Sequence, residues 1–458
     1  MKKLLACFVL LVAGCVTTPH DYSDPVDPSQ VTAQDLKNHA LMLEDRYQQY
    51  HQVEGIIWQR YRSDPSLAEP DIYGKGGDSC IFTGTKLAAD VYRYEVTGAS
   101  EDLDRVLQSL RGLYILCNIT GTPGVFARAA FPANRASEWN YPTAWAGRDP
   151  QFVHTSSDDI ADPFNPGANF PEMVYYTRST KDQLTGLLYG LATTWKFLEA
   201  RSADHQDRVA LALQVVARMS EDVYNHLRAN DFEIVDENGN NDTTADSVSG
   251  LLKLQLLAVY RATVGDTSPH RAARISEKYD EQFPRSFFNI ADTVHVFTNY
   301  DAYYAWNLRH TRAYSIFILE MNSERQETIR RWYQDRLWQY ISGHYNAKFI
   351  YMQNFVTPGL GSLPDAYLSM QSLRLKPIRS YDSPLAGDER KPSLLQVLWG
   401  DTDRFVLLPH LRKPTDYTIW QKEPWDTGTP GNNGSANTTG LDFMLAYWMG
   451  RYHGFLSD

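Results

Sequence analysis

One short motif, placed at the start of an apolar helical run, recurs along the chain and constrains its fold more than any other feature. Residues 182–191 read Asp-Gln-Leu-Thr-Gly-Leu-Leu-Tyr-Gly-Leu, and residues 246–254 repeat the order of acid, hydroxyl, glycine and aliphatic side chains. Looser copies begin at Asp78 and Asn437. A helix start that repeats in this way predicts equivalent positions in an array of helical hairpins.

Apolar residues recur with helical spacing through most of the chain after residue 32. The predicted helices span 33–62 (one helix or two), 79–97, 100–119, 181–201, 203–229, 247–264, 269–283, 301–320, 324–342, 365–373, 393–399 and 438–452. Every second one carries more surface charge. The remaining helices are predicted to form an inner ring of six, and they open near Asp78, Asp182, Asp246, Asp301, Asp365 and Thr438.

Residues 124–180 interrupt this rhythm. The segment has almost no periodicity, and loops of this length in a compact domain are uncommon and generally functional or disordered. Its arginines and aromatic side chains favour a function, since Arg128 could clamp a carboxylate or sulfate while aromatic rings stack on sugars. The alternative is that the aromatic side chains only pack the loop onto the helices. The substrate-binding candidates of this loop are Arg128, Trp139, Trp145 and His154.

The hairpin rhythm and the long loop together resemble the six-hairpin glycosidase-like toroids, the (α/α)6 barrels of many bacterial glycoside hydrolases and polysaccharide lyases. The resemblance spans residues 33–455, and its local signs are Thr83-Gly84, Thr185-Gly186, Ser249-Gly250 and Thr439-Gly440. It implies an all-α (α/α)6 toroid with long irregular loops that leave room for short β-hairpins. It also implies a substrate cleft at the end where the inner helices begin. No individual family is matched, so no catalytic residue is inherited.

Aspartates at the predicted inner-helix starts are the candidate catalytic groups. Glycoside hydrolysis needs one protonated carboxyl and one ionised carboxylate, which two neighbouring inner helices can supply. Asp182 and Asp246 form the first predicted pair because their contexts repeat most closely, followed by Asp78 and then Asp301. The alternative for each is a helix N-cap, a position that favours aspartate.

The predicted helix at 301–320 opens with an unusual density of polar and aromatic side chains. Tyr303, Trp306 and His310 share one face at helical spacing. A lyase acting on uronates needs a base and an acid-neutralising group, and Tyr303, His310, Asn307 and Arg309 could provide that set. The alternative is an inner-helix stripe packed against its neighbours. We count Tyr303, Trp306 and His310 among the substrate-binding candidates, together with Gln183, which follows Asp182.

The N-terminus is predicted to be a lipoprotein signal. Lys2 and Lys3 precede a short apolar run and the small residues before Cys15, as in a bacterial lipobox. We therefore expect residues 1–14 to be the signal peptide, residues 15–32 a lipidated cysteine and flexible tether, and residues 33–458 one domain. Val16, which is not an aspartate, favours the outer membrane.

Composition narrows the partners. The net charge of -11 argues against nucleic acid, while aromatic residues at 13% suit both a large core and a sugar-binding surface. Cys80 and Cys117 are either a disulfide, which an oxidising compartment permits, or two buried thiols. The chain has no phosphate-binding loop, zinc-protease motif or serine nucleophile elbow, which argues against a nucleotide enzyme, a zinc protease and a serine hydrolase. No metal or cofactor is expected.

The sequence therefore predicts an envelope-bound, glycan-active enzyme that acts on an oligo- or polysaccharide, with hydrolysis by paired carboxylates as the first hypothesis. A polysaccharide lyase and a non-catalytic toroid that binds a glycan or a protein are the alternatives. Oligomeric state stays open.

Overall fold

The computed structural model describes most of the predicted domain and none of the predicted signal peptide. For residues 152–155 it describes the backbone alone. The described residues are 27–64, 69–74, 76–139, 152–155, 160–176, 179–201, 205–240, 247–264, 269–287, 303–378, 383, 385–388, 391–393, 396, 401–413, 418–428 and 436–457.

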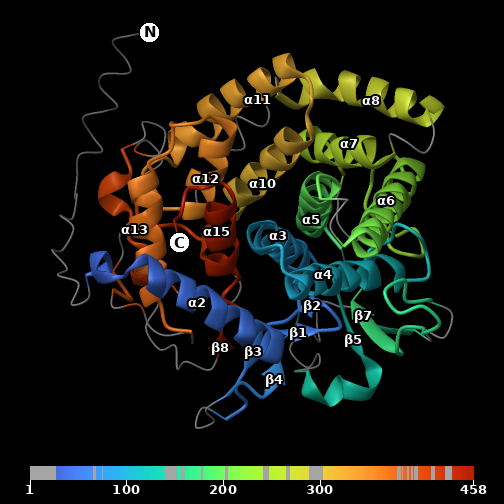
Figure 1. Cartoon of the computed structure of the whole chain (residues 1–458), viewed down its shortest axis with the longest axis horizontal. Coiled ribbons are helices and arrows are strands. Elements are labelled where there is room, and N and C mark those ends of the chain that lie inside the picture. The colour runs from blue at the N-terminus through green and yellow to red at the C-terminus, as the bar shows by residue number, and fades with distance from the viewer. Residues whose placement is uncertain are drawn as a thin grey trace.

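Six helices of the described residues form the inner ring of an all-α toroid (Figure 1). Each contacts the next, and the last contacts the first, so the ring is closed. This confirms the predicted fold class. In ring order they are α3 (Ser79–Thr97), α5 (Lys181–Glu199), α7 (Gly250–Val264), α10 (Tyr303–Leu319), α12 (Ala347–Val356) and α15 (Leu441–Tyr452).

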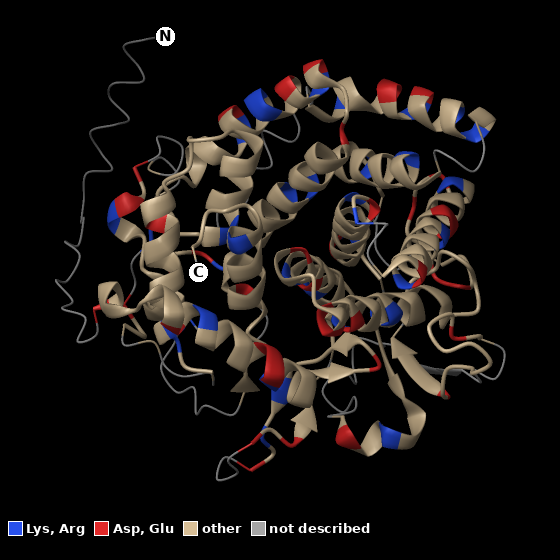
Figure 2. Cartoon of the chain, viewed as in Figure 1, with Lys and Arg blue, Asp and Glu red and all other residues tan. Residues whose placement is uncertain are grey.

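An outer helix follows each of the first five inner helices, and the sixth outer position belongs to the N-terminal helix α2. Helix α2 contacts both α13 and α15, which brings the start of the chain against its end. Outer helices α8 and α11 carry charges of both signs (Figure 2). The outer helices are α2 (Ala33–Arg46), α4 (Ser100–Asn118), α6 (Gln206–Ala229), α8 (Pro269–Phe287), α11 (Ser323–Arg336) and α13 (Leu363–Leu375).

The inner helices run parallel, so their starts share one end of the ring, which we call the N-terminal face. At that face the Gln183 side chain of α5 reaches Asp78, the residue before α3. At the opposite end the ring of His453, just after α15, packs on Phe355 near the end of α12. Any group at an inner-helix start therefore lies at the N-terminal face.

The predicted inner helix at Asp365 is wrong. Helix α13, which contains Asp365 in its first turn, is an outer helix whose N-cap is Ser362. The inner helix that precedes it is α12, which the sequence did not reveal. Nearly every residue of α12 is buried, so it lacks the polar face that makes helical periodicity visible. Asp365 is thereby removed from the predicted ring of acids.

The predicted helix or helices at 33–62 are also only partly right. Helix α2 ends at Arg46, and the π-helical turn η2 (Tyr47–His51) leads into extended chain. Because Ile56, Ile57 and Trp58 are all buried, this apolar run fits a buried strand as well as a helix. The strands are β1 (Gln52–Val53) and β2 (Ile56–Ile57), which form a hairpin, and β3 (Arg60–Tyr61), which pairs with β4 (Ile72–Tyr73) and β8 (Ala436–Asn437).

The long segment 124–180 contains a small antiparallel sheet. Its central strand β7 (Met173–Tyr176) pairs with β5 (Ala129–Pro132) and β6 (Phe152–Thr155). The 3-10 helix η3 (Ala133–Glu138) follows β5. These short strands agree with the expectation that the long loops between the helices could contain short β-hairpins.

The remaining described elements are single 3-10 turns. The first, η1, packs on α13, where the Gln371 amide donates to the carbonyl of Val31 (2.7 Å). The end of the predicted tether is therefore part of the folded body from Asp27 onward. These turns are η1 (Pro28–Gln30), η5 (Trp338–Tyr340), η6 (Asp403–Phe405), η7 (Pro409–Leu411) and η8 (Ile419–Gln421).

The repeated glycines have two different roles. A Cβ on Gly84 would lie 2.0 Å from the carbonyl oxygen of Gly186, and a Cβ on Gly186 would lie 2.3 Å from that of Ile81. These two glycines let α3 and α5 pack backbone to backbone. Gly250 and Gly440 instead adopt positive φ angles of 52° and 71° where α7 and α15 begin, a conformation that glycine takes at no steric cost.

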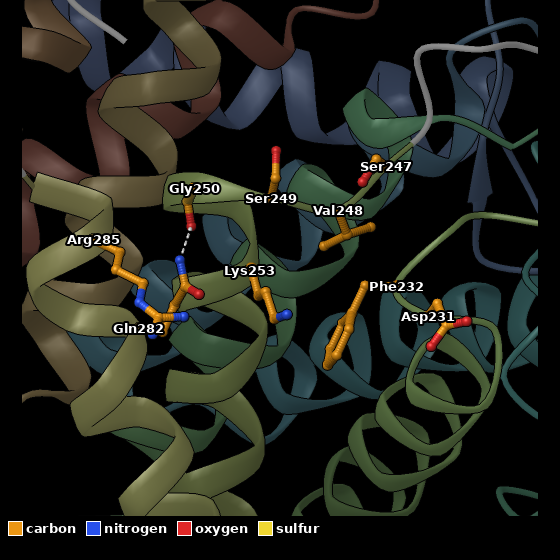
Figure 3. Close-up of a pocket in the computed structure, with 9 residues that line it drawn as sticks. All are labelled: Asp231, Phe232, Ser247, Val248, Ser249, Gly250, Lys253, Gln282 and Arg285. Carbon is orange, nitrogen blue, oxygen red and sulfur yellow. Dashed lines mark hydrogen bonds between the residues drawn. The ribbon is translucent and has the colours of Figure 1, made fainter. Parts of the chain in front are cut away.

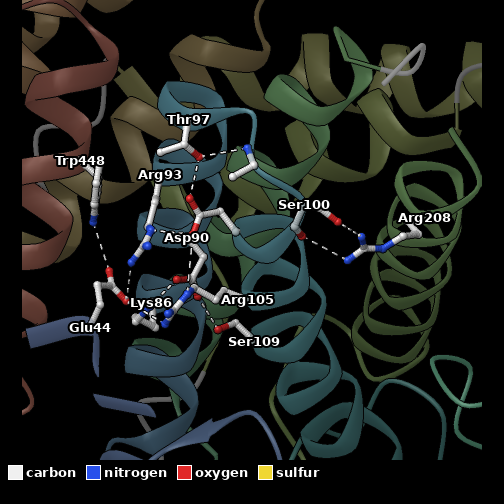
Figure 4. A network of polar contacts seen from close by, with 12 residues as sticks. Glu44, Lys86, Asp90, Arg93, Thr97, Ser100, Arg105, Ser109, Arg208 and Trp448 are labelled. Carbon is white, nitrogen blue, oxygen red and sulfur yellow. Dashed lines mark hydrogen bonds and ion pairs between the residues drawn. The ribbon is translucent and has the colours of Figure 1, made fainter. Parts of the chain in front are cut away.

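A buried network of charges joins α2, α3, α4 and α15 (Figure 4). The Lys86 ammonium is fully buried and donates to Glu44 (3.1 Å) and to Asp90. Asp90 also accepts from the Ser109 hydroxyl (2.6 Å), and Glu44 accepts from the Trp448 indole (3.1 Å). The network therefore links the N-terminal helix to the last helix at the point where the ring closes.

Buried histidines make the stability of the fold depend on pH. Burial lowers the pKa of His51 to about 4 and that of His39, His344 and His453 to about 3. Below about pH 6.5 the unfolded chain binds protons at these side chains and the folded chain does not. The contribution of each histidine to the free energy of unfolding is therefore fully present above about pH 6.5 and decreases as the pH falls toward about 4.

We therefore expect the free energy of unfolding to fall by about 1.4 kcal/mol per histidine for each pH unit below 6.5. His453→Phe, whose ring would pack in the same aromatic surroundings, should flatten this dependence by about one histidine's share. Urea unfolding at pH 7.0, 6.0 and 5.0 measures both slopes. Equal slopes for the variant and the unmodified protein would show that His453 takes up no proton on unfolding.

Candidate functional site

Asp78 and Asp182 stand at the starts of α3 and α5, yet neither carboxylate caps its helix. Asp78 occupies the N-cap position, but its side chain makes no capping hydrogen bond. The N-cap of α5 is Thr180, which forms a capping box with Gln183. Capping, the structural alternative for these aspartates, is therefore wrong for both, and their carboxylates need another explanation.

The Asp78 carboxylate is held by two side chains. Arg128 donates to its Oδ1 atom (3.3 Å), and so does the amide of Gln183 (3.3 Å). Arg128 also donates to the carbonyl of Gly77 and lies over the Tyr176 ring, 5.7 Å from its centroid. Because the Asp78 side chain is still 44% exposed, it is oriented by these contacts and open to a ligand.

Asp182 has a different environment from Asp78. Burial raises the pKa of the half-buried Asp182, and the nearby Asp78 adds to this, while Arg312 and Arg128 oppose it. Arg312 reaches this point from α10 and donates to the Thr185 hydroxyl (2.9 Å). The N-terminal face therefore carries one carboxyl whose pKa is raised by burial beside one that is paired with an arginine.

Such a pair suits general acid–base chemistry. A carboxyl with a raised pKa can donate a proton to a leaving oxygen, while an ionised neighbour activates water or attacks directly. The sequence analysis ranked Asp182, with Asp246, as the first pair of catalytic candidates and Asp78 as the next candidate after them. The structure brings these two together through Gln183 and Arg128, which were predicted as substrate-binding residues.

The polar stripe of α10 lies inside the protein. The Tyr303 hydroxyl bonds to His344 (3.0 Å), and Tyr303 is 1% exposed. His310 is fully buried against the Tyr333 hydroxyl, and burial lowers its pKa well below the usual value. Trp306 packs on Tyr340. The stripe matches the packing alternative, and the assignment of these three residues to substrate binding stays a prediction.

Trp139 is likewise a packing residue. Its ring is stacked on Tyr73 and on Phe131, with centroids 4.4 and 4.5 Å away, and it is 4% exposed. Trp139 therefore holds the small sheet against the hairpin of β3 and β4. It does not offer a face to a sugar.

Several predicted site residues lie outside the described part of the chain. They are Asp246, Asp301, Trp145 and Cys15. For His154 only the backbone is described, where it pairs with Val174 between β6 and β7. The pairing of Asp182 with Asp246 therefore stays a prediction.

Two basic residues near the centre of the ring were not found from the sequence. Arg312 lies in the middle of α10, where nothing local distinguishes it. Lys348 at the start of α12 is buried and donates to Asn307 (2.7 Å) and Thr311 (3.0 Å), and burial lowers its pKa to about 7. A lysine within the apolar run of α12 was the available signal.

Cys80 and Cys117 are both buried and both free, so of the two alternatives the structure has the two buried thiols and not the disulfide. Burial raises the pKa of each thiol, as expected for an apolar environment. Among the described residues no group of three or more histidine, cysteine or acidic side chains is arranged to hold a metal ion. No helix in the described ranges is long and apolar enough to cross a membrane.

Two solved structures resemble this chain along most of its length. A sugar epimerase from a ruminal bacterium matches 93% of this chain and 99% of its own, at 11% identity and a TM-score of 0.38. A GH9 protein of Bacteroides ovatus matches 94% of this chain and 83% of its own, at 11% identity and a TM-score of 0.39. No family model and no curated protein matches the chain. The fold assignment rests on the closed ring of inner helices described above.

Proposed function

We propose that this toroid hydrolyses a glycan, with Asp182 as the proton donor and Asp78 as the ionised partner. The observation that carries the proposal is a pair of aspartates at the N-terminal face whose side chains do not cap their helices. Asp182 has a raised pKa, and Asp78 is paired with Arg128. Neither carboxylate has a structural task in its own helix.

Asp182 would protonate the oxygen that leaves when the glycosidic bond breaks. Asp78 would act on the sugar carbon, either by activating a water molecule or as the nucleophile. Arg128 and Gln183 would keep Asp78 oriented through the reaction, since both donate to its Oδ1 atom. Asp246 is the remaining candidate for the partner role.

The lyase hypothesis has less support. Its base and acid-neutralising groups were expected on α10, and Tyr303 and His310 are occupied by His344 and Tyr333 inside the packed ring. A non-catalytic toroid that binds a glycan or a protein is the competing class, which an activity test separates.

Incubation of the purified protein with a panel of neutral and uronate-containing oligosaccharides tests the proposal. Mass spectrometry of the products should show water added across a glycosidic bond in at least one sugar. An unsaturated uronate product would indicate the lyase instead. Sugars that stay intact while the protein remains folded would contradict both enzymes and favour the binding toroid.

We also propose that a lipid on Cys15 attaches the domain to the outer membrane. The support is the sequence alone, namely the short apolar run and the small residues before Cys15. Labelling of bacterial cells that express the chain with a radioactive or alkyne fatty acid should mark the protein, and Cys15→Ser should abolish the label. A label that survives this change, or a protein that never acquires one, would contradict lipidation.

A further inference from the structure

A cavity of about 320 Å³ opens beside the start of α7, at the N-terminal face (Figure 3). The cavity lies on the side of α7 that faces the end of α6 and helix α8. Gln255, two residues beyond Lys253 and so on the opposite side of α7, donates to the carbonyl of Thr185 on α5 (3.3 Å). The volume falls in the range of small-molecule sites. The described lining residues are Asp231, Phe232, Ser247, Val248, Ser249, Gly250, Lys253, Gln282 and Arg285.

Two cations line this cavity. Lys253 comes from α7 and Arg285 from the last turn of α8, and within the described residues neither forms an ion pair with a carboxylate. The Lys253 ammonium lies 3.5 Å from the centroid of the Phe232 ring, which gives it an apolar floor. Burial lowers the pKa of Lys253, and the neighbouring Arg285 and Lys278 lower it further. Mutually repelling cations of this kind gain free energy when an anion binds between them.

Neutral polar groups complete the wall. Ser247 and Ser249 line the cavity beside the start of α7, where the first backbone N–H groups have no acceptor within the helix. The Gln282 amide is fixed by its bond to the carbonyl of Gly250 (3.4 Å). The one carboxylate in the lining, Asp231, is exposed. Hydroxyl and amide groups around a pair of cations suit a sugar that carries an acidic group.

We infer that this cavity binds the anionic substituent, a carboxylate or a sulfate, of an acidic sugar, with Lys253 and Arg285 as its cations. The inference rests on the proposed function, because it names the substrate class of the same face. An acidic residue of the glycan would occupy the cavity while another part of the same glycan lies at Asp182 and Asp78.

Calorimetric titration of the purified protein with glucuronate, sodium sulfate and glucose tests the cavity without relying on catalysis. We expect glucuronate or sulfate to bind and glucose to bind at least about 10-fold more weakly, as the loss of a charged hydrogen bond requires. Lys253→Met and Arg285→Gln should each weaken anion binding by about 10- to 100-fold. Preference between the two anions distinguishes a uronate from a sulfated sugar.

Lys278→Gln is the matched control. Lys278 contributes to the same positive field but does not line the cavity, and it pairs with Glu281 (3.1 Å). Binding should change by less than about twofold in this variant. Arg285 is exposed, so its replacement leaves the packed ring intact.

Two results would overturn the inference. One is that glucuronate and sulfate bind no better than glucose, and the other is that the two cavity variants behave like Lys278→Gln. Anion binding that depends on both cations, in a protein that cleaves no sugar of the panel, would leave the inference standing and refute hydrolysis. Cleavage of neutral sugars by a protein that binds no anion would support hydrolysis and refute the anion-binding cavity.

Discussion

Asp182→Asn is expected to lower kcat on the glycan that the panel identifies by about 10²- to 10⁴-fold, the usual contribution of a general acid or base. Asparagine keeps the size of the side chain and cannot give up the proton. Asp78→Asn should cause a loss of similar size, because it also removes the charge that Arg128 holds in place. Initial rates at saturating substrate measure both effects.

Asp365→Asn is the control for these variants. Asp365 lies in the first turn of the outer helix α13, so the change is chemically identical at a helix start outside the inner ring. Its rate should stay within about twofold of the unmodified protein, as for most substitutions away from a site. A rate for Asp182→Asn that matches this control would remove Asp182 from the mechanism.

The raised pKa of Asp182 also predicts the shape of the pH–rate profile. A proton donor works in its protonated form, so activity should decline as pH rises through the pKa of Asp182. Because burial and Asp78 raise that pKa, the decline should fall at a higher pH than an ordinary aspartate would give. Asp182→Asn should abolish this limb of the profile in whatever activity it retains.

Lys86→Met is expected to destabilise the fold by about 3–5 kcal/mol, the usual cost of removing one partner from a buried ion pair. The substitution preserves most of the side-chain volume and leaves the buried carboxylates of Glu44 and Asp90 without their shared ammonium. Arg93 and Arg105 lie 3.7 and 3.9 Å from Glu44, so Glu44 keeps nearby positive charges when Lys86 is replaced. Asp90 has no such arginine among its ion pairs in the described residues, so loss of the Lys86 ammonium affects Asp90 more. Urea unfolding followed by circular dichroism measures the change.

A second variant separates charge from packing at this network. Lys86→Met combined with Asp90→Asn should recover part of the lost stability, because the buried negative charge is removed together with its partner. Lys278→Met breaks an exposed pair and should cost less than about 1 kcal/mol. If Lys86→Met is no more costly than Lys278→Met, the network does not hold the ends of the ring together.

The repeated motif predicted the ring because each copy marks a helix start, and that information is local. It could not separate Gly84 and Gly186, which let two helices touch, from Gly250 and Gly440, which begin helices in a left-handed conformation. That difference depends on which helix passes nearby. The missed helix α12 shows the same limit from another side, since a segment buried all round has no periodic polar face.

The candidate site was predicted by residue type and corrected by geometry. Aspartate at a helix start has two explanations, and only the observed capping by Thr180 and the pairing of Asp78 with Arg128 decide between them. Arg312 had no local signal because it reaches Thr185 from another inner helix, and Lys253 and Arg285 had none because only the fold brings α7 and α8 together around the cavity. The stripe of Tyr303, Trp306 and His310 looked catalytic because a packed inner helix can carry the same polar residues as an active site.

A crystal structure of the Asp182→Asn protein with an oligosaccharide from the panel tests the central claim most directly. The account predicts a glycosidic oxygen within about 3 Å of the side chain of residue 182, the distance of a proton transfer. Asp78 should lie on the other side of the sugar ring that carries the bond. A sugar bound with no glycosidic bond within about 10 Å of both residues would contradict the account.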